Sequence, residues 1–518
     1  MSGQLQLNLA HDRRRPNMSA LPWDIHGCIL PLVVDTADLS RYMRTCSTIY
    51  FLGIPKLLKN VRFPSPSRSL LHLQSFCHFA LNHNPQRIHL LRELHLPELS
   101  QLDDEASASS IQEEVVDMLS RVILGAKHLE TLHIVGFDED YLSFDSVLFR
   151  AITSNTNLHT VDVLVTKMTE TALLRALPHS IRKVVIRFEF RFVAEEDLTA
   201  LDPTSLLSGL AYSLEELHII YPPEGMDIAV TDGCRFFHVH SFVMVSPDFG
   251  NLHAEDLAYT FPKLKTLILR GDMDAGESEM AREENQEHTE YEDMAWQHLE
   301  RLRCDNGPTY ALAFRCTVQH WEGIHLPELI VRPEVKFHAN LKDLRPDYLD
   351  VTLFIPDFED EDEMLAVFPS DQSSVTHLNI EVLSPFEPFD RHAPSDEEPP
   401  HSNMRWVKWL GESICNLKSL VVLSIRCCFE HQYGRSLTLN HDRTLRDNLD
   451  RMVGTLFATL AGLSHIYFQF NLAPDLDVGW KRPVGGQSTA EELSEDDAWE
   501  VMKASPFAEK LCSRLIVE

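Results

Sequence analysis

Cysteine is sparse in this chain of 518 residues, and no two cysteines form a Cys-x-x-Cys pair. The ten cysteines are scattered at positions 28, 46, 77, 234, 304, 316, 415, 427, 428 and 512. In a chain of this length, single cysteines without paired spacing are typical of buried, reduced thiols. We therefore expect a cytoplasmic or nuclear protein.

Long apolar runs and an excess of basic residues are also missing. No run of about 18 apolar residues occurs, so we expect no transmembrane helix, and residues 1–20 lack the apolar core of a signal peptide. Lys and Arg number 46 against 78 Asp and Glu, which gives a net charge of −32. This charge opposes binding to nucleic acid and to anionic membranes, so we expect neither as a partner.

Motifs that bind phosphate or carry catalysis are absent as well. The sequence has no Walker-type loop, no Gly-x-Gly-x-x-Gly, no Gly-x-Ser-x-Gly and no His-Glu-x-x-His. His238 and His240 place two imidazoles on one face of a strand, a spacing that zinc can use, but no third ligand is marked nearby. We expect no catalytic residue, no metal site and no cofactor.

The first structured segment follows residues 1–18, which are polar and for which we expect a disordered tail. Pro22 suits the first turn of a helix, where its missing N–H costs nothing. Ile25, Ile29 and Leu32 then recur at helical spacing and form an apolar stripe.

Two more helices are expected in this segment. The pattern from Ala37 to about Leu52 predicts the second, with Asp38 or Thr36 as its cap, and a third short helix should follow Pro55. Pro31 removes a backbone hydrogen bond inside the first helix, which must therefore end early or bend.

Residues 19–63 resemble an F-box of the form common in fungal proteins. The landmarks of that family occur here in order, as Leu21-Pro22-Trp23-Asp24-Ile25, Asp35-Thr36-Ala37-Asp38-Leu39, Thr45-Cys46-Ser47-Thr48-Ile49-Tyr50 and Pro55-Lys56-Leu57-Leu58-Lys59-Asn60-Val61-Arg62-Phe63. The segment departs from the family in Asp24, where Glu is usual, in Pro31, and in Thr45, where an aliphatic residue is usual.

The F-box resemblance implies binding to a Skp-family adaptor and, through it, to a cullin-RING ubiquitin ligase. The positions that match the family's contacts are Leu21, Pro22, Ile25, Ile29 and Leu39. Without that activity, the same helices would be a cap that covers the open end of a repeat array.

A strand motif of the form Leu-x-x-Leu-x-Leu recurs through the rest of the chain. Its eleven copies start at Leu91, Leu129, Leu158, Ile181, Leu214, Leu264, Leu299, Leu326, Val375, Leu420 and Leu463. The last two apolar positions alternate with a polar one, which is the period of a strand with one buried face. Between copies lie helical patterns such as 111–124.

One strand and one helix per unit is the plan of a leucine-rich repeat. We therefore predict an α/β fold in which residues 64–470 form an irregular leucine-rich-repeat solenoid, with parallel strands on the concave face and helices outside. The copies are 23 to 50 residues apart, so the long gaps contain either unmarked strands, of which 348–355 is one, or loop insertions. An ordinary α/β domain with a shared strand entry is the alternative.

Acidic residues gather in three segments between strand motifs, 272–293, 357–363 and 390–403. Like charges repel, so we expect extended, solvated loops that serve either solubility or a basic partner. For residues 471–518 we expect a loop and capping helices, because Ser488 and Glu491 have capping-box spacing.

Three functional hypotheses follow. The first is a substrate-recognition subunit of a ubiquitin ligase of the SCF type, which is not itself an enzyme. A protein-interaction scaffold with a vestigial F-box is the second, and an α/β enzyme is the third. For contacts with a protein target we nominate His95, His133, His218 and Arg303, which alternate outward beside buried strand residues.

Overall fold

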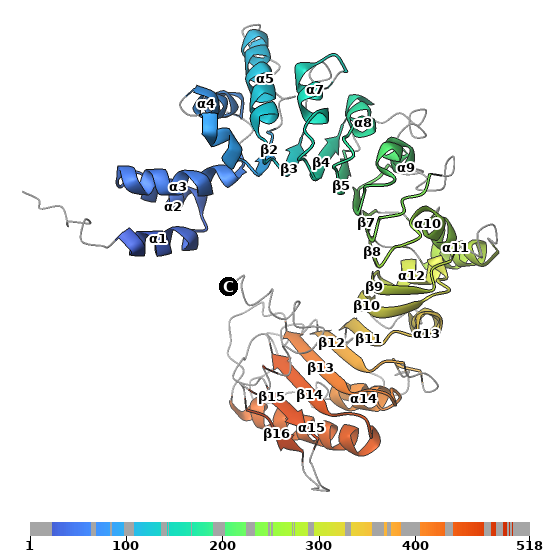
Figure 1. The fold of residues 1–518 in the computed structure, drawn as a ribbon. Coiled ribbons are helices and arrows are strands. Elements are labelled where there is room, and N and C mark those ends of the chain that lie inside the picture. Colours follow the sequence, from blue (N-terminus) through green and yellow to red (C-terminus); the bar gives the residue numbers. More distant parts are fainter. Residues whose placement is uncertain are drawn as a thin grey trace, which may run out of the picture. The chain divides into compact units, whose positions relative to one another are not determined.

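A computed structural model describes residues 23–500 of the chain, except for a set of gaps at 64–68, 83–84, 98–107, 136–141, 143, 167, 190–201, 224–233, 247–248, 250–251, 272, 274, 288–294, 327–332, 355–366, 370–373, 385–404, 430–438, 471–477, 483–489, 495–496 and 498–499. The chain divides into two compact units, Met1–Val163 and Leu164–Glu518. Within each unit the helices lie on one side of the strands (Figure 1).

The first unit opens with helices α1 (Trp23–Leu32), α2 (Thr36–Met43) and α3 (Ser47–Lys59). Asp35 caps α2 by accepting a hydrogen bond from the Asp38 N–H at 2.9 Å, and Cys46 caps α3 through its sulfur. The predicted helix from 37 to 52 is therefore wrong in its bounds, because these caps divide it. Pro55 lies inside α3 and does not precede it.

Helix α1 ends directly after Pro31, at Leu32. The Lys56 ammonium donates hydrogen bonds to three backbone carbonyls at this end, those of Leu30 at 2.9 Å, Pro31 at 2.8 Å and Val33 at 2.6 Å. Carbonyls at a helix C-terminus have no partner within the helix, and a cation there also favours the helix dipole. Lys56 thereby fixes the end of α1 to α3.

The strands of the first unit are β1 (Asn60–Val61), β2 (Glu93–His95), β3 (Thr131–Ile134) and β4 (Thr160–Val165), paired in parallel in chain order. Helices α4 (Ser69–Asn82), α5 (Ala108–Gly125) and α7 (Val147–Thr153) stand between them in the chain. Leu94, Leu132 and Val161 share one row of the sheet and are fully buried. This confirms the buried face that the strand motif predicts.

The second unit continues the same alternation. Its parallel strands are β5 (Lys183–Phe188), β6 (Glu216–Ile220), β7 (Ser241–Val245), β8 (Thr266–Arg270), β9 (His298–Arg303), β10 (Thr317–Leu326), β11 (Tyr348–Phe354), β12 (His377–Ser384), β13 (Val422–Phe429) and β14 (His465–Phe470). Its helices are α8 (Met168–Arg175), α9 (Pro203–Leu206), α10 (Ala254–Thr260), α11 (Ala275–Glu287), α12 (Asn306–Leu312), α13 (Pro333–Leu344), α14 (Arg405–Ile414) and α15 (Leu439–Thr459).

Ten of the eleven strand motifs coincide with strands, and the copy that starts at Leu326 cannot be compared beyond its first residue. Leu326 is the last residue of β10, and the remainder of that copy lies outside the described residues. The motif misses β10 because a bulge between Trp321 and Ile324 adds a residue to its spacing. Gly323 occupies the bulge with a φ of 76°, a conformation that glycine adopts without steric cost.

The first acidic segment is largely helical and not an extended loop. Helix α11 occupies 275–287 within it, and Ser278, Ala281 and Asn285 lie buried along one side of the helix. One side of α11 is therefore buried while its glutamates face outward. The charge pattern alone did not predict this amphipathic helix. The acidic segments 357–363 and 390–403 lie outside the described residues.

The C-terminal end of the second unit also differs from the prediction. Strand β15 (Val478–Lys481) runs antiparallel to β14, and β16 (Glu491–Glu492) runs antiparallel to β15. The predicted cap at Ser488 is outside the described residues, and Glu491 is in a strand. Ser494 makes a cap-like bond instead, accepting from the Asp497 N–H at 3.2 Å.

No helix among the described residues has the length and apolar character that a bilayer crossing requires.

Candidate functional site on the strand face

We call the side of the strands turned away from the helices the strand face. The four residues nominated for target contacts all lie on it, each beside or between buried residues of its strand. His95 and His133 are neighbours in the first unit, whereas in the second unit β7 and β8 separate His218 on β6 from Arg303 on β9.

His95, His133 and Asp162 form one row across β2, β3 and β4, because the parallel register pairs His95 with His133 and His133 with Asp162. The two imidazole rings are stacked, with centroids 3.7 Å apart and planes 7° from parallel. Asp162 is buried, and its Oδ2 lies 2.9 Å from His133 Nδ1. A buried carboxylate therefore holds the far side of the His133 ring.

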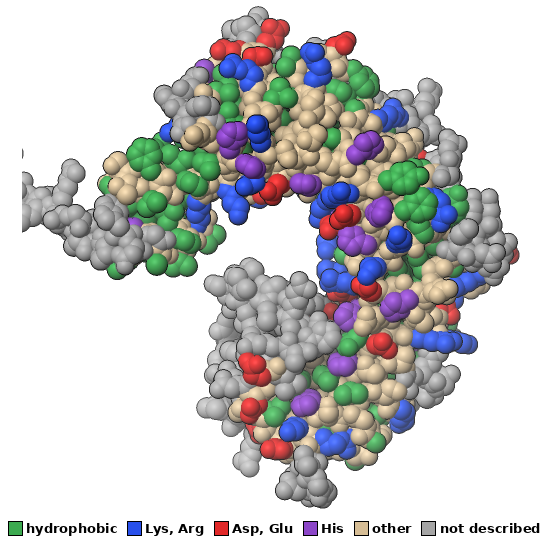
Figure 2. Space-filling view, viewed as in Figure 1, with side chains coloured by type: hydrophobic (Ala, Val, Ile, Leu, Met, Phe, Trp, Pro, Cys, Tyr) green, Lys and Arg blue, Asp and Glu red, His purple; other side chains and the backbone are tan. Residues whose placement is uncertain are grey.

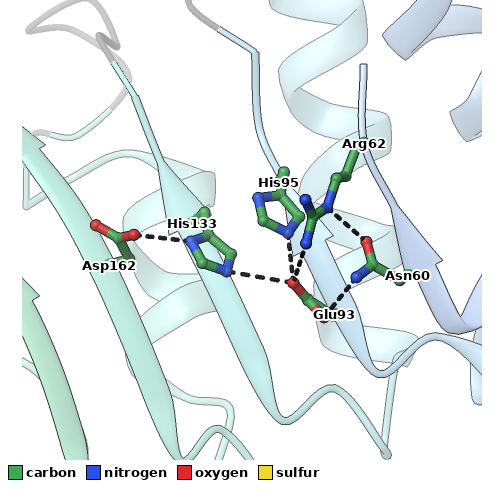
Figure 3. A network of polar contacts seen from close by, with 6 residues as sticks. All are labelled: Asn60, Arg62, Glu93, His95, His133 and Asp162. Carbon is green, nitrogen blue, oxygen red and sulfur yellow. Dashed lines mark hydrogen bonds and ion pairs between the residues drawn. The ribbon is translucent and has the colours of Figure 1, made fainter. Parts of the chain in front are cut away.

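Glu93 lies two residues before His95 on the same face of β2 and links this row to β1 (Figure 3). Its Oε1 is 2.5 Å from His95 Nε2 and 3.5 Å from His133 Nε2. The Arg62 guanidinium approaches the same oxygen at 3.3 Å, and the Asn60 amide donates to Oε2 at 2.6 Å. One carboxylate thus contacts side chains from three strands or their ends.

The charge states in this network follow from its contacts. Burial opposes ionisation of Glu93, but the hydrogen bond from His95 and the positive charges around it outweigh burial and lower the pKa of Glu93. Burial lowers the pKa of His95, helped by Arg62 and His133 and opposed by Glu93. Glu93 is therefore an anion and His95 a neutral imidazole near pH 7.

Glu93, His95 and His133 each present one atom able to bind a metal, and these atoms lie within 4.8 Å of one another. Sequence reasoning found the two histidines but missed Glu93 and Asp162. A signal was present, because superposing the copies of the strand motif aligns His95, His133 and Asp162 at one position.

In the second unit the strand face carries oppositely charged pairs on neighbouring strands. Lys183 Nζ lies 2.7 Å from Glu216 Oε2, and Arg301 on β9 forms an ion pair with Glu322 on β10. Lys, Arg, Asp, Glu and His side chains alternate along this side in Figure 2. Such a polar surface suits a partner with its own mixed charges.

Farther along the second unit, one row of the strand face consists of aromatic rings and the next row consists of buried polar side chains. Tyr348 lies between His320 and His377, with ring centroids 4.3 and 4.5 Å away. The next row contains Asp350, Asn379, Ser424 and Tyr467, all buried. The Asn379 amide donates to Asp350 Oδ1 at 2.9 Å.

The nominated adaptor contacts in the first unit have mixed outcomes. Leu21 and Pro22 lie outside the described residues. Ile25 is 38% exposed and Ile29 is half-buried. Leu39 is a correction: it is only 2% exposed and belongs to the core of the three helices, so its side chain does not face a partner.

No protein-family model matches this chain, and no curated protein matches it. Among solved structures, a chain from the crystal structure of the Rad7 and Elc1 complex in yeast is similar, with a TM-score of 0.31 and 12% sequence identity. That match covers 81% of this chain and 98% of the other. A likeness at this level identifies no family and assigns no activity.

Proposed function

We propose that this chain is a non-catalytic recognition subunit of a cullin-RING ubiquitin ligase. Helices α1 to α3 would bind a Skp-family adaptor, and the strand face would hold a protein target. The observation that carries the proposal is an apolar stripe on α1 that faces solvent.

The exposed stripe on α1 consists of Ile25, Ile29 and Leu32, at positions i, i+4 and i+7 of the helix. Ile25 is 38% exposed and Leu32 is 77% exposed, whereas His26 and Leu30 are buried among the α1 side chains that the structure describes. The helix thus turns apolar side chains outward and buries a histidine beside Leu30. A surface helix without a partner normally has the opposite arrangement.

Further apolar side chains extend the stripe at the end of α1. Val34 is 91% exposed, and Leu52 lies one turn before Lys56, which holds that end of the helix. Hydrophobic side chains gather over α1 to α3 in Figure 2. Contiguous exposed apolar surface marks a docking site for another protein, which agrees with the F-box resemblance of this segment.

The strand face supports the second half of the proposal. It combines half-buried histidines with charged pairs on neighbouring strands, and it offers a partner preformed hydrogen-bonding groups. The sequence contains none of the catalytic motifs that we searched for. We therefore propose recognition without a reaction.

The test is co-expression of the full chain with a Skp-family adaptor, followed by measurement of co-elution. We expect the wild type to co-elute and the double variant Ile25→Asp/Leu32→Asp to lose binding, because each change places a charge in the apolar contact. Val335→Asp is the matched control, since Val335 is also exposed, at 61%, but lies on α13 of the second unit.

Both variants should keep the wild-type circular dichroism spectrum, because all three positions are exposed. Equal co-elution of the wild type and the α1 variant would refute adaptor binding through this stripe. If the wild type does not bind the adaptor at micromolar concentration, the protein is a scaffold whose helices only cap the array. Self-association that the α1 variant abolishes would assign the stripe to a second copy of the chain.

A further inference from the structure

We propose that Glu93, His95 and His133 bind one divalent transition-metal ion of the zinc class on the strand face of the first unit. This inference does not depend on adaptor binding, since its residues lie on β2 and β3. Two imidazoles and one carboxylate form a ligand set that zinc uses in proteins.

The three ligand atoms lie close enough for one tetrahedral ion, once the His95 ring turns out of its stack on His133 so that the two Nε2 lone pairs converge. Ligand atoms at about 2.05 Å from zinc lie about 3.3 Å from each other. Glu93 Oε1 and His133 Nε2 are 3.5 Å apart, close to that value. Glu93 Oε1 and His95 Nε2 are 2.5 Å apart, so the ion must replace their hydrogen bond and separate them by about 1 Å.

His133 gives a second, independent reason for an ion. Its Nδ1 faces Asp162 and its Nε2 faces Glu93, so both ring nitrogens point at carboxylates. A neutral imidazole has only one N–H, and its other nitrogen is an acceptor that a carboxylate repels. Either a second proton or a metal ion on Nε2 removes that conflict, and with the metal Nδ1–H donates to Asp162 while the Nε2 lone pair binds the ion.

Asp162 is positioned to orient His133 as a metal ligand. Ligating histidines usually donate their second N–H to a carboxylate or carbonyl, which fixes the tautomer and raises the basicity of the ligand. Asp162 is buried and 2.9 Å from His133 Nδ1, so it holds the ring whether or not the ion is bound.

The site is open on its outer side. The side chains of Glu93, His95 and His133 are 28%, 23% and 22% exposed, so solvent reaches the ligands. Three protein ligands leave at least one coordination position for water. A carboxylate or imidazole of a bound protein can replace that water, which would give the strand face a metal-dependent contact.

A nearly identical local sequence in the second unit provides a matched comparison. Glu216 and His218 stand two residues apart on β6 as Glu93 and His95 do on β2. The neighbours of His218 in its row are Val185 and Val243, however, so among the described residues no third ligand stands beside the pair. The cross-strand neighbour therefore distinguishes the proposed site from a Glu-x-His pair.

The experiment uses the full chain, freed of metal by a chelator, and titration with Zn²⁺ by calorimetry and with Co²⁺ by visible absorption. We expect the wild type to bind one equivalent more than His133→Val, with nitrogen- and oxygen-ligated Co²⁺ bands that lack a thiolate charge-transfer band. His218→Val is the control and should keep the wild-type stoichiometry.

Two further variants separate metal binding from structure. Asp162→Asn keeps the shape of the side chain and should weaken affinity about 10- to 100-fold. Arg62→Ala removes a cation 3.3 Å from Glu93 and should tighten binding, a gain that a purely structural network would not produce.

The proposal is overturned if folded wild type and folded His133→Val bind the same number of equivalents with equal affinity. Should His133→Val not fold, Glu93→Gln, which keeps the size of the side chain, decides by the same criterion. In either case the cluster is a hydrogen-bond network alone. The adaptor experiment is unaffected by this result, because its variants lie on α1.

Discussion

Two regions of the strand face have the same parallel strand pairing but differ in how deeply their polar side chains are buried. In the first unit, Glu93 and His133, which lie in adjacent rows, are half-buried and surrounded by several polar partners. In the second unit, Asn379 and Tyr467 are buried, and atoms of both lack a hydrogen-bond partner among the described residues. The backbone register aligns both regions, so side-chain chemistry and burial alone make the difference.

The comparison separates a surface suited to binding from one that determines stability. Exposed polar groups exchange protein partners for water at little cost, whereas buried polar groups have no such exchange. Substitutions in the buried region should therefore change the free energy of unfolding, and substitutions in the half-buried region should change ligand binding.

The largest expected effect is a loss of unfolding free energy at Asn379, and Asn60 provides the comparison because each asparagine donates to a carboxylate. Asn379→Ala leaves the buried Asp350 carboxylate without this donor and should cost about 3 kcal/mol of unfolding free energy. Asn60→Ala removes the donor to the half-buried Glu93 and should cost less than about 1 kcal/mol. Urea denaturation of both variants measures the contrast, and equal losses would contradict it.

A smaller effect of opposite sign is expected at Tyr467. Its hydroxyl is buried and has no hydrogen-bond partner among the described residues, and burial raises its pKa. Tyr467→Phe removes the unsatisfied group while keeping the ring, so stability should be unchanged or rise by about 1 kcal/mol. A loss larger than about 1 kcal/mol in urea denaturation would mean that the hydroxyl has a partner in the folded protein.

The smallest expected effect is a pH dependence in the second unit. Burial lowers the pKa of His377, as does the charge of His320, while Asp347 opposes the shift. Burial likewise lowers the pKa of His320, which faces Glu322 and Arg301 as well as Asp347. Protons therefore bind the unfolded chain first as the pH falls below about 6.5, and stability present above that pH is lost.

His377→Gln should flatten this pH dependence, because the variant has no imidazole to titrate at this position. The measurement is the urea midpoint of wild type and variant at about pH 7.5 and about pH 5.5, roughly one pH unit on either side of the usual histidine pKa. Parallel losses in the two proteins would show that His377 does not contribute.

Much of the fold could be predicted because its signal is local. Leu94, Leu132 and Val161 alternate with polar residues, and that period alone predicts a strand with one buried face. The N-terminal helices were predicted in number but not in bounds, since the cap at Cys46 is a sulfur and not a usual capping oxygen.

The remaining features depend on contacts between distant residues. Neither the bond from Lys56 to the end of α1 nor the bulge at Gly323 has a sequence signal of its own. The Glu93 cluster is intermediate, because its members are ordinary residues until the strands are placed in register. Register is a property of the whole ladder, so a search for local motifs finds the histidines and misses their partners.

The antiparallel strands that follow β14 have a consequence for assembly. A ladder of parallel strands ends in an edge that a second copy could extend, and repeated addition would give a filament. Here β15 reverses the strand direction, and β16, the last described strand, has two residues, both exposed glutamates. A short, charged edge of reversed strand direction is a poor template for a second copy, so the described end of the ladder disfavours growth by strand addition.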